Sequence, residues 1–288
     1  MAEGDPHAVT VGTVTALDQI NHWPVSTAAA AWIRGDGQTR SAGDVHRVFE
    51  LASVTKALFG YAVLVAVEEG SLNLDQPAGP GGSTVAHLLS HSSGLAPEAN
   101  DSGRSAFAAV ASRRIYSNQG FDVLGAALAD ATGMDPTTYF QLAVVEPLAM
   151  SATSLEGSPA HGARSSVHDL LLFCRELMNP RLIDRTTLET ATRQFLPNLV
   201  GVLPGFGRQS PNPWGLGFEI RGHKEPHWTG STNSVRTYGH FGAAGTFLWH
   251  DPELDVAAVA LTDGPFGSWA AEAWPPLSDA VIVEAVGT

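Results

Sequence analysis

The chain of 288 residues is 44% hydrophobic and 16% charged, with 30 glycines and 18 prolines, which is typical of a globular chain with many loops. Its net charge of −13 leaves no basic surface for a nucleic acid or an anionic membrane, so neither partner is expected. The first 22 residues contain no signal peptide pattern, and no apolar run reaches transmembrane length. The sequence therefore predicts a cytoplasmic protein, although a secreted form trimmed of its leader would read the same.

Strand-like segments occupy both ends of the chain, and helical patterns lie between them. This predicts an α/β (α+β) fold, in which an antiparallel sheet is flanked by N- and C-terminal helices. Residues 1–50 and 213–288 would form the α/β lobe, and residues 51–212 an inserted, mainly helical lobe of the same catalytic unit. In chain order, we expect a helix at 14–21, strands at 26–34 and 38–41, helices at 53–70, 120–132, 166–178 and 186–195, strands at 215–221, 239–250 and 256–262, and a helix at 275–286.

Lys56 is one of only two lysines, with Lys224, and it lies in the most apolar helix of the chain. Burial without a partner lowers the pKa of an ammonium group, so that its amine can serve as a general base. Ser53 lies one helical turn earlier, near a helix N-terminus that favours a developing oxyanion. The same spacing also occurs by chance, with Ser53 as a helix N-cap and Lys56 extended to the surface.

Two further short segments, 116–118 and 240–243, contain candidate site residues. Tyr116 near an ammonium can have a lowered pKa and relay protons, and Asn118 can bind a substrate carbonyl or the lysine. His240 precedes Gly242 and Ala243, where a glycine permits close approach to a strand and the next N–H can complete an oxyanion hole. Each pattern alone also fits ordinary structure, with Asn118 as a helix cap, Tyr116 as a packing residue and His240 partly exposed.

Other enzyme classes lack their motifs in this sequence. There is no G-x-S-x-G elbow, and the acidic residues are too scattered to form a glycosidase pair. His223 and His227 have no flanking glutamate for a zinc motif, and the glycine-rich segment 79–82 has no P-loop ending. The single cysteine, Cys174, lies in an apolar run and is predicted to be a buried structural thiol. No metal ion and no cofactor is therefore expected.

The S-V-T-K, Y-S-N and H-F-G motifs, taken in this order, resemble those of the serine β-lactamase and penicillin-binding-protein superfamily. The branch that is most similar contains class C β-lactamases, D,D-peptidases and family VIII esterases. The resemblance spans roughly residues 25–265, and it is specific for the superfamily but not for a substrate, because one fold hosts many reactions. The segments that carry it are 49–56, 68–75, 87–95, 116–150 and 239–263.

The resemblance implies a role for each candidate residue. Ser53 would attack an acyl carbonyl and become an acyl-enzyme, while Lys56 and Tyr116 share the proton transfers. The backbone N–H groups of Ser53 and Ala243 would form the oxyanion hole, next to Gly242. Asn118 would orient Lys56 or a substrate amide.

His240 occupies the place of the lysine in the K-T-G triad of many lactamases, and Phe241 removes the neighbouring hydroxyl. Histidine is mostly neutral near neutral pH, so binding of a substrate carboxylate should weaken. The leading hypothesis is a serine hydrolase acting on small-molecule esters, with weak or no β-lactamase activity. The alternatives are a D,D-peptidase, a D-aminopeptidase or a β-lactamase acting on amides or β-lactams, and a catalytically silent binding or sensor module. The sequence leaves the oligomeric state open.

Overall fold

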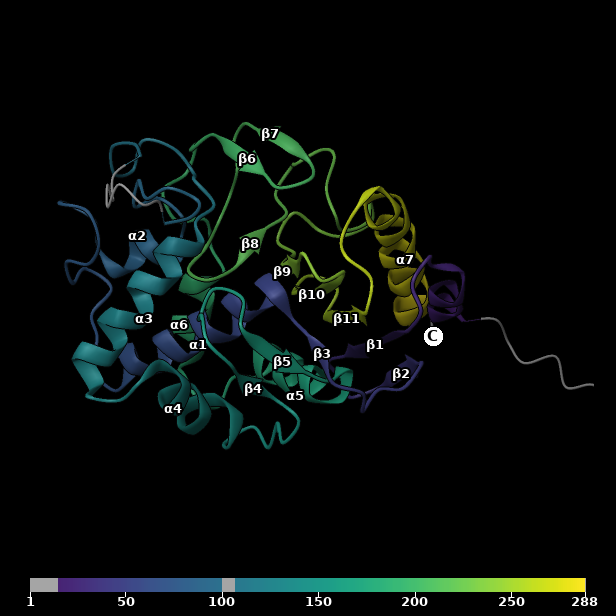
Figure 1. The fold of residues 1–288 in the computed structure, drawn as a ribbon. Coiled ribbons are helices and arrows are strands. Elements are labelled where there is room, and N and C mark those ends of the chain that lie inside the picture. Colours follow the sequence, from purple (N-terminus) through teal and green to yellow (C-terminus); the bar gives the residue numbers. More distant parts are fainter. Residues whose placement is uncertain (1–14, 100–106, 288) are drawn as a thin grey trace, which may run out of the picture.

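The computed structural model describes residues 15–99 and 107–287, and both ends of the chain contribute to one sheet (Figure 1). The sheet has six strands in the order β2-β1-β11-β10-β9-β8, and every neighbouring pair is antiparallel. The predicted α/β class with an antiparallel sheet is thereby confirmed. The strands are β1 (Ala28–Arg34), β2 (Thr39–Ala42), β8 (Glu219–Ile220), β9 (Tyr238–Gly242), β10 (Thr246–Asp251) and β11 (Val256–Thr262).

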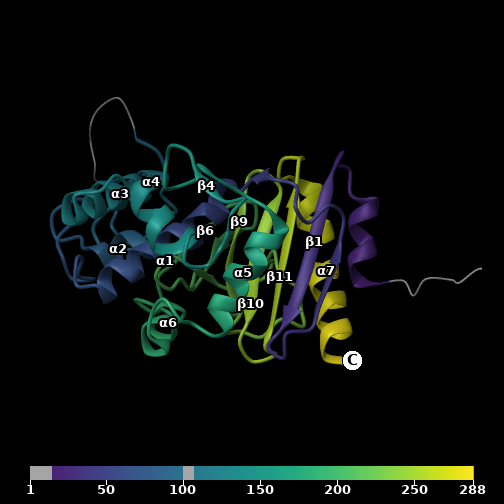
Figure 2. The ribbon, with the colours of Figure 1, turned by 90° about the horizontal axis from the view of Figure 1, so that it is seen from below.

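The sheet is buried on both faces, which explains why its central strands are apolar throughout instead of alternating with polar residues. In β1, Ala29, Ala31 and Ile33 face one hydrophobic core, whereas Ala30 and Trp32 face the other. Helices cover each face (Figure 2). They are η1 (Ala16–His22) and α7 (Ser268–Gly287) on one side and α5 (Val167–Met178) on the other.

The helix α1 (Thr55–Glu68) passes through the middle of the larger core. Its first twelve residues, 55–66, are all buried, because neighbouring helices surround it and it presents no polar face to water. The 3₁₀ turn η2 (Ala52–Val54) leads into α1. The remaining elements are β3 (Phe49–Glu50), α2 (Val85–Leu89), α3 (Asn118–Thr132), α4 (Pro136–Phe140), the π-helix η3 (Gln141–Val145), β4 (Ser154–Leu155), β5 (Ala163–Ser165), α6 (Arg185–Ala191), β6 (Gly201–Leu203) and β7 (Gly207–Gln209).

Two predicted strands differ from those in the structure. The segment 239–250 is not one strand, because the chain reverses after Gly242, whose carbonyl accepts a hydrogen bond from the Gly245 N–H at 3.0 Å. Gly245 has a φ of +75°, which glycine adopts without strain. The segment 215–221 contains only the two strand residues of β8, because Gly217 turns the backbone with a φ of +87°.

Two predicted helices have different ends. The helix expected at 186–195 ends at Ala191. The last helix begins at Ser268 and continues through Pro275 and Pro276, instead of beginning at the first proline. No helix in the described part of the chain is both long and apolar enough to span a bilayer. The predicted boundaries of the two lobes stay a prediction.

Candidate active site

Ser53 lies in the turn that precedes α1, and this turn is held from both sides. Ala52 has a φ of +44°, a left-handed conformation that is disfavoured for a residue with a side chain. The Leu51 N–H donates to the Ala163 carbonyl at 2.9 Å. The Thr246 hydroxyl donates to the Leu51 carbonyl, also at 2.9 Å. These bonds fix a strained turn that leaves Ser53 partly accessible at the start of the helix.

Lys56 is fully buried, so the alternative in which it extends to the surface is wrong. Its Nζ lies 3.2 Å from Ser53 Oγ, as the one-turn spacing predicts. Nζ also donates to Asn118 Oδ1 at 2.6 Å and to the Ala160 carbonyl at 2.8 Å. All three hydrogen-bond partners are uncharged.

This environment changes the protonation state of Lys56. Burial lowers its pKa to about 7, and the more distant carboxylates of Glu98 and Asp122 only partly oppose this effect. A large fraction of the lysine is therefore a neutral amine near neutral pH. A neutral amine has a lone pair, which can accept the proton of the Ser53 hydroxyl.

The ring of Tyr116 lies 4.7 Å from Lys56 Nζ and packs between His91, Trp214 and His240. Its hydroxyl lies close to the Ser53 hydroxyl. Burial raises its pKa, and the nearby Ser53 hydroxyl only partly opposes this. The expectation that a neighbouring ammonium lowers the pKa of Tyr116 is therefore wrong. Tyr116 is a protonated hydroxyl that can donate a proton.

Asn118 is the first residue of α3, but it is not the cap, because Ser117 Oγ accepts the Gly120 N–H at 2.9 Å. Its amide is occupied at both ends. Oδ1 accepts from Lys56, and Nδ2 donates to Glu98 Oε1 at 2.5 Å. Of the two roles predicted for Asn118, the structure therefore favours orientation of the lysine over contact with a substrate amide.

His240 is 3% exposed, so the expectation of a partly exposed side chain is wrong. Its Nδ1 lies 2.6 Å from the Phe241 carbonyl, which assigns the proton to Nδ1. Nε2 is therefore a hydrogen-bond acceptor, and it has no partner among the described residues. Burial, together with the charges of Lys56 and Lys224, lowers the pKa of His240 to about 3, and the hydrogen bond to the Phe241 carbonyl opposes only part of this effect. The side chain is neutral near neutral pH.

Gly242 allows β9 to pass directly against the turn that carries Ser53. A Cβ at this position would lie 2.3 Å from the Leu51 carbonyl oxygen and 3.1 Å from the Ser53 nitrogen, so no larger residue fits. The next residue, Ala243, lines the same cavity as Ser53. The contact thus places both predicted oxyanion-hole residues beside one cavity.

A cavity of about 230 Å³ brings most of the predicted site together, since Ser53, Tyr116, Asn118, His240 and Ala243 all line it. Six lining residues lie outside the predicted motifs: Leu203, Pro204, Gly205, Trp214, Glu219 and Phe266. They come from segments without a motif, so their place in the site follows from the fold alone. In the described part of the chain, no group of three or more His, Cys, Asp or Glu residues could hold a metal ion.

The antiparallel sheet, the buried lysine and the serine one turn away define a serine hydrolase with a β-lactamase fold. The model of the beta-lactamase family matches residues 24–280, so this chain belongs to the β-lactamase family. The superfamily inferred from the three motifs is confirmed.

Solved structures and curated proteins extend this relationship. A β-lactamase from Mycobacterium bovis is 50% identical with a TM-score of 0.92, covering 94% of this chain and 100% of that one. EstCE1, a hydrolase with promiscuous acyltransferase activity, is 18% identical with a TM-score of 0.74, covering 93% and 96%, a likeness of fold alone. The D-alanyl-D-alanine-carboxypeptidase/endopeptidase AmpH of Escherichia coli (strain K12) is 29% identical over 164 residues. That match covers 44% of this chain and 42% of AmpH, so it includes less than half of either protein.

Proposed function

We propose that this protein is an esterase that hydrolyses neutral acyl esters through an acyl-enzyme on Ser53, with weak or no β-lactamase activity. The observation that carries the proposal is the contact of 3.2 Å between Ser53 Oγ and Lys56 Nζ, because burial gives this lysine a pKa of about 7. A serine hydroxyl beside a neutral amine has the base that nucleophilic attack requires.

In the first half-reaction, Ser53 Oγ bonds to the acyl carbon while its proton passes to Lys56 Nζ. The carbonyl oxygen becomes an oxyanion, stabilised by the backbone N–H groups of Ser53 and Ala243. Collapse of this intermediate breaks the bond to the alcohol oxygen, which takes a proton from the Tyr116 hydroxyl as Lys56 returns one to Tyr116. Water then attacks the acyl-enzyme in the same way and releases the carboxylic acid.

The lining of the catalytic cavity supports an uncharged acyl group. Its described side chains include no lysine and no arginine. His240 offers a neutral acceptor where a cation would bind a substrate carboxylate. A β-lactam or a peptide with a free C-terminus therefore lacks a charge partner at this position, whereas a simple ester needs none.

The test compares hydrolysis of short p-nitrophenyl esters with hydrolysis of nitrocefin. We expect the esters to react faster, and we expect Ser53→Ala to lower kcat/KM for them by about 10⁴-fold or more. Full activity in Ser53→Ala would overturn the nucleophile, and faster turnover of nitrocefin would overturn the ester preference. Mass spectrometry after fluorophosphonate treatment should find the adduct on Ser53, and absence of any adduct would favour a silent binding module.

A further inference from the structure

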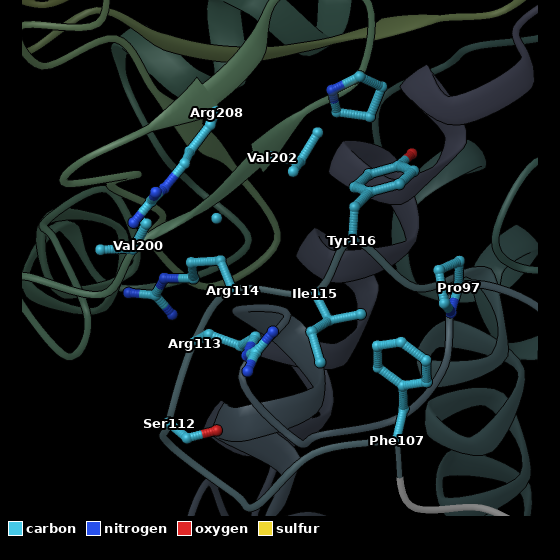
Figure 3. A pocket seen from close by; sticks show the side chains of 12 residues that line it. Pro97, Phe107, Ser112, Arg113, Arg114, Ile115, Tyr116, Val200, Val202 and Arg208 are labelled. Atoms are coloured by element: carbon cyan, nitrogen blue, oxygen red, sulfur yellow. The ribbon is translucent and has the colours of Figure 1, made fainter.

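A second and larger chamber, of about 740 Å³, adjoins the catalytic cavity. Tyr116 and Pro204 line both spaces, so the chamber and the catalytic cavity lie next to each other at these two residues. Figure 3 shows Arg208 on one side of the chamber and Phe107 and Pro97 on the opposite side. Neither the three motifs nor the proposed reaction assigns a purpose to this chamber.

The wall of the chamber at Arg114 and β6 is fixed by the framework of the fold. The Arg114 N–H donates to the Val200 carbonyl at 2.9 Å. The buried guanidinium of Arg114 donates to the carbonyls of Ser90 at 2.8 Å and Leu196 at 3.0 Å. At Gly201, a Cβ would lie 2.6 Å from the Arg114 Cβ, so β6 packs directly on this residue. This wall is therefore preformed, and the space that it borders has the size of a small-molecule site.

The mouth of the chamber exposes apolar side chains that most proteins would bury. Phe107 is 66% exposed and Val202 is 59% exposed, and Ile115 and Val200 extend this apolar lining. Exposed apolar side chains that gather at one cavity mark a ligand surface. The apolar lining fits a hydrocarbon body.

Two exposed arginines, Arg113 and Arg208, lie beside this apolar surface. Within residues 15–99 and 107–287, neither side chain has an ion pair or a hydrogen bond. Arginines without an ionic partner among the described residues are notable in a chain with a net charge of −13. A guanidinium group binds a carboxylate in a planar, two-pronged arrangement.

We propose that the chamber binds the leaving-group half of the substrate, an alcohol with an extended apolar body and one carboxylate at its far end. This inference rests on the proposed esterase function. The alcohol oxygen takes its proton from Tyr116, and Tyr116 lines the chamber, so the alcohol leaves into the chamber while the acyl group stays on Ser53. His240 is neutral and cannot bind a substrate carboxylate beside the nucleophile. In this proposal, Arg113 and Arg208 bind the carboxylate at a position farther from Ser53.

The test keeps the acyl group constant and varies the alcohol. The acetate ester of ω-hydroxydecanoic acid carries the carboxylate, and the same ester with its acid methylated is the neutral counterpart. We expect kcat/KM to favour the anionic ester by about tenfold, the worth of one charge-assisted hydrogen bond. The Arg113→Glu/Arg208→Glu double variant should reverse this ratio, and Arg236→Glu, an exposed arginine outside the chamber, should preserve it.

Three results would overturn the chamber assignment. The first is equal turnover of the two esters by the unaltered enzyme. The second is a double variant that keeps the anionic preference, with circular dichroism confirming its fold. The third is a stronger preference for the reversed substrate, the ethyl ester of a dicarboxylic acid, in which the long anionic chain belongs to the acyl half.

A binding measurement separates this inference from the esterase proposal. In Ser53→Ala, which cannot form an acyl-enzyme, we expect calorimetry to detect ω-hydroxydecanoate binding that weakens at least about tenfold with Arg113→Glu/Arg208→Glu. If ω-hydroxydecanoate binds in this way but the unaltered protein hydrolyses no ester, the chamber assignment is supported and the esterase proposal is refuted. If the protein hydrolyses esters but shows neither this binding nor a preference for the anionic ester, the esterase proposal is supported and the chamber assignment is refuted.

Discussion

The only two lysines of the chain, Lys56 and Lys224, are both buried, but their surroundings differ by one carboxylate. Lys224 Nζ contacts the carboxylate of Glu219, and it also donates to Asn212 Oδ1 at 3.2 Å and to the Pro213 carbonyl at 3.1 Å. Lys56 donates to three uncharged acceptors. Burial lowers the pKa of both lysines, but a carboxylate in direct contact with Lys224 occupies its amine, so burial alone does not free a lysine to act as a base on a substrate.

Glu219 explains why the second lysine is structural. Its carboxylate also contacts His227 Nε2 at 3.0 Å and accepts from Trp228 Nε1 at 2.8 Å. These contacts fasten β8 to the loop that follows it and satisfy both carboxylate oxygens. A charge network of this kind holds the wall of the catalytic cavity without taking part in proton transfer.

The largest expected contrast is between methionine substitutions of the two lysines. Lys56→Met removes the base, so we expect kcat/KM for p-nitrophenyl acetate to fall by about 10³-fold with little loss of stability. Lys224→Met leaves Glu219 buried without its ammonium partner, so we expect a loss of about 3–5 kcal/mol in the free energy of unfolding. Its folded fraction should retain activity. Urea denaturation and steady-state kinetics would test both, and equal losses of activity would refute the contrast.

The next experiment converts the environment of Lys56 into that of Lys224. Asn118→Asp places a carboxylate against Lys56 Nζ, which raises the pKa of this lysine above its value of about 7. The base must be neutral, so activity rises with pH through this pKa, and the limb moves to higher pH in the variant. We expect a shift of more than about one unit, hence roughly tenfold lower activity near neutral pH that recovers in alkali. A pH–rate profile with an unmoved limb would exclude Lys56 as the controlling base.

The smallest expected effect comes from adding a cation to the catalytic cavity. His240→Lys replaces a neutral acceptor by a side chain that binds a carboxylate, so we expect KM for nitrocefin to fall by about threefold to tenfold. Esters without a carboxylate serve as the control substrates and should show no such gain in binding. An unchanged KM for nitrocefin would contradict the specificity that we assign to position 240.

The order of the three motifs allowed the family to be predicted. The buried state of Lys56 could be predicted because α1 is apolar on every side. The contacts that set the chemistry are long-range and could not be read from spacing. The Ala160 carbonyl and Glu98 reach the site from segments without a motif. The protonated state of Tyr116 depends on burial in three dimensions, whereas proximity to Lys56 alone suggested the opposite.

The boundaries of the strand predicted at 239–250 were wrong for a related reason. The reversal after Gly242 lies inside an apolar run, and the sequence pattern contains no proline or polar cluster to mark it. The position of the turn is set by the close approach of Gly242 to Leu51, which only the folded chain reveals.

The hydrogen bond between Thr246 and Leu51 joins residues 195 positions apart in the chain, and this has a consequence for biosynthesis. The nucleophile is translated before the segment that supplies its proposed oxyanion partner, and most of the 195 positions between Leu51 and Thr246 are synthesised in the interval. A partly made chain therefore has the serine and the lysine but no complete site. Because long-range contacts of this kind close late in folding, the first appearance of ester hydrolysis during refolding would report that these two distant segments have come together.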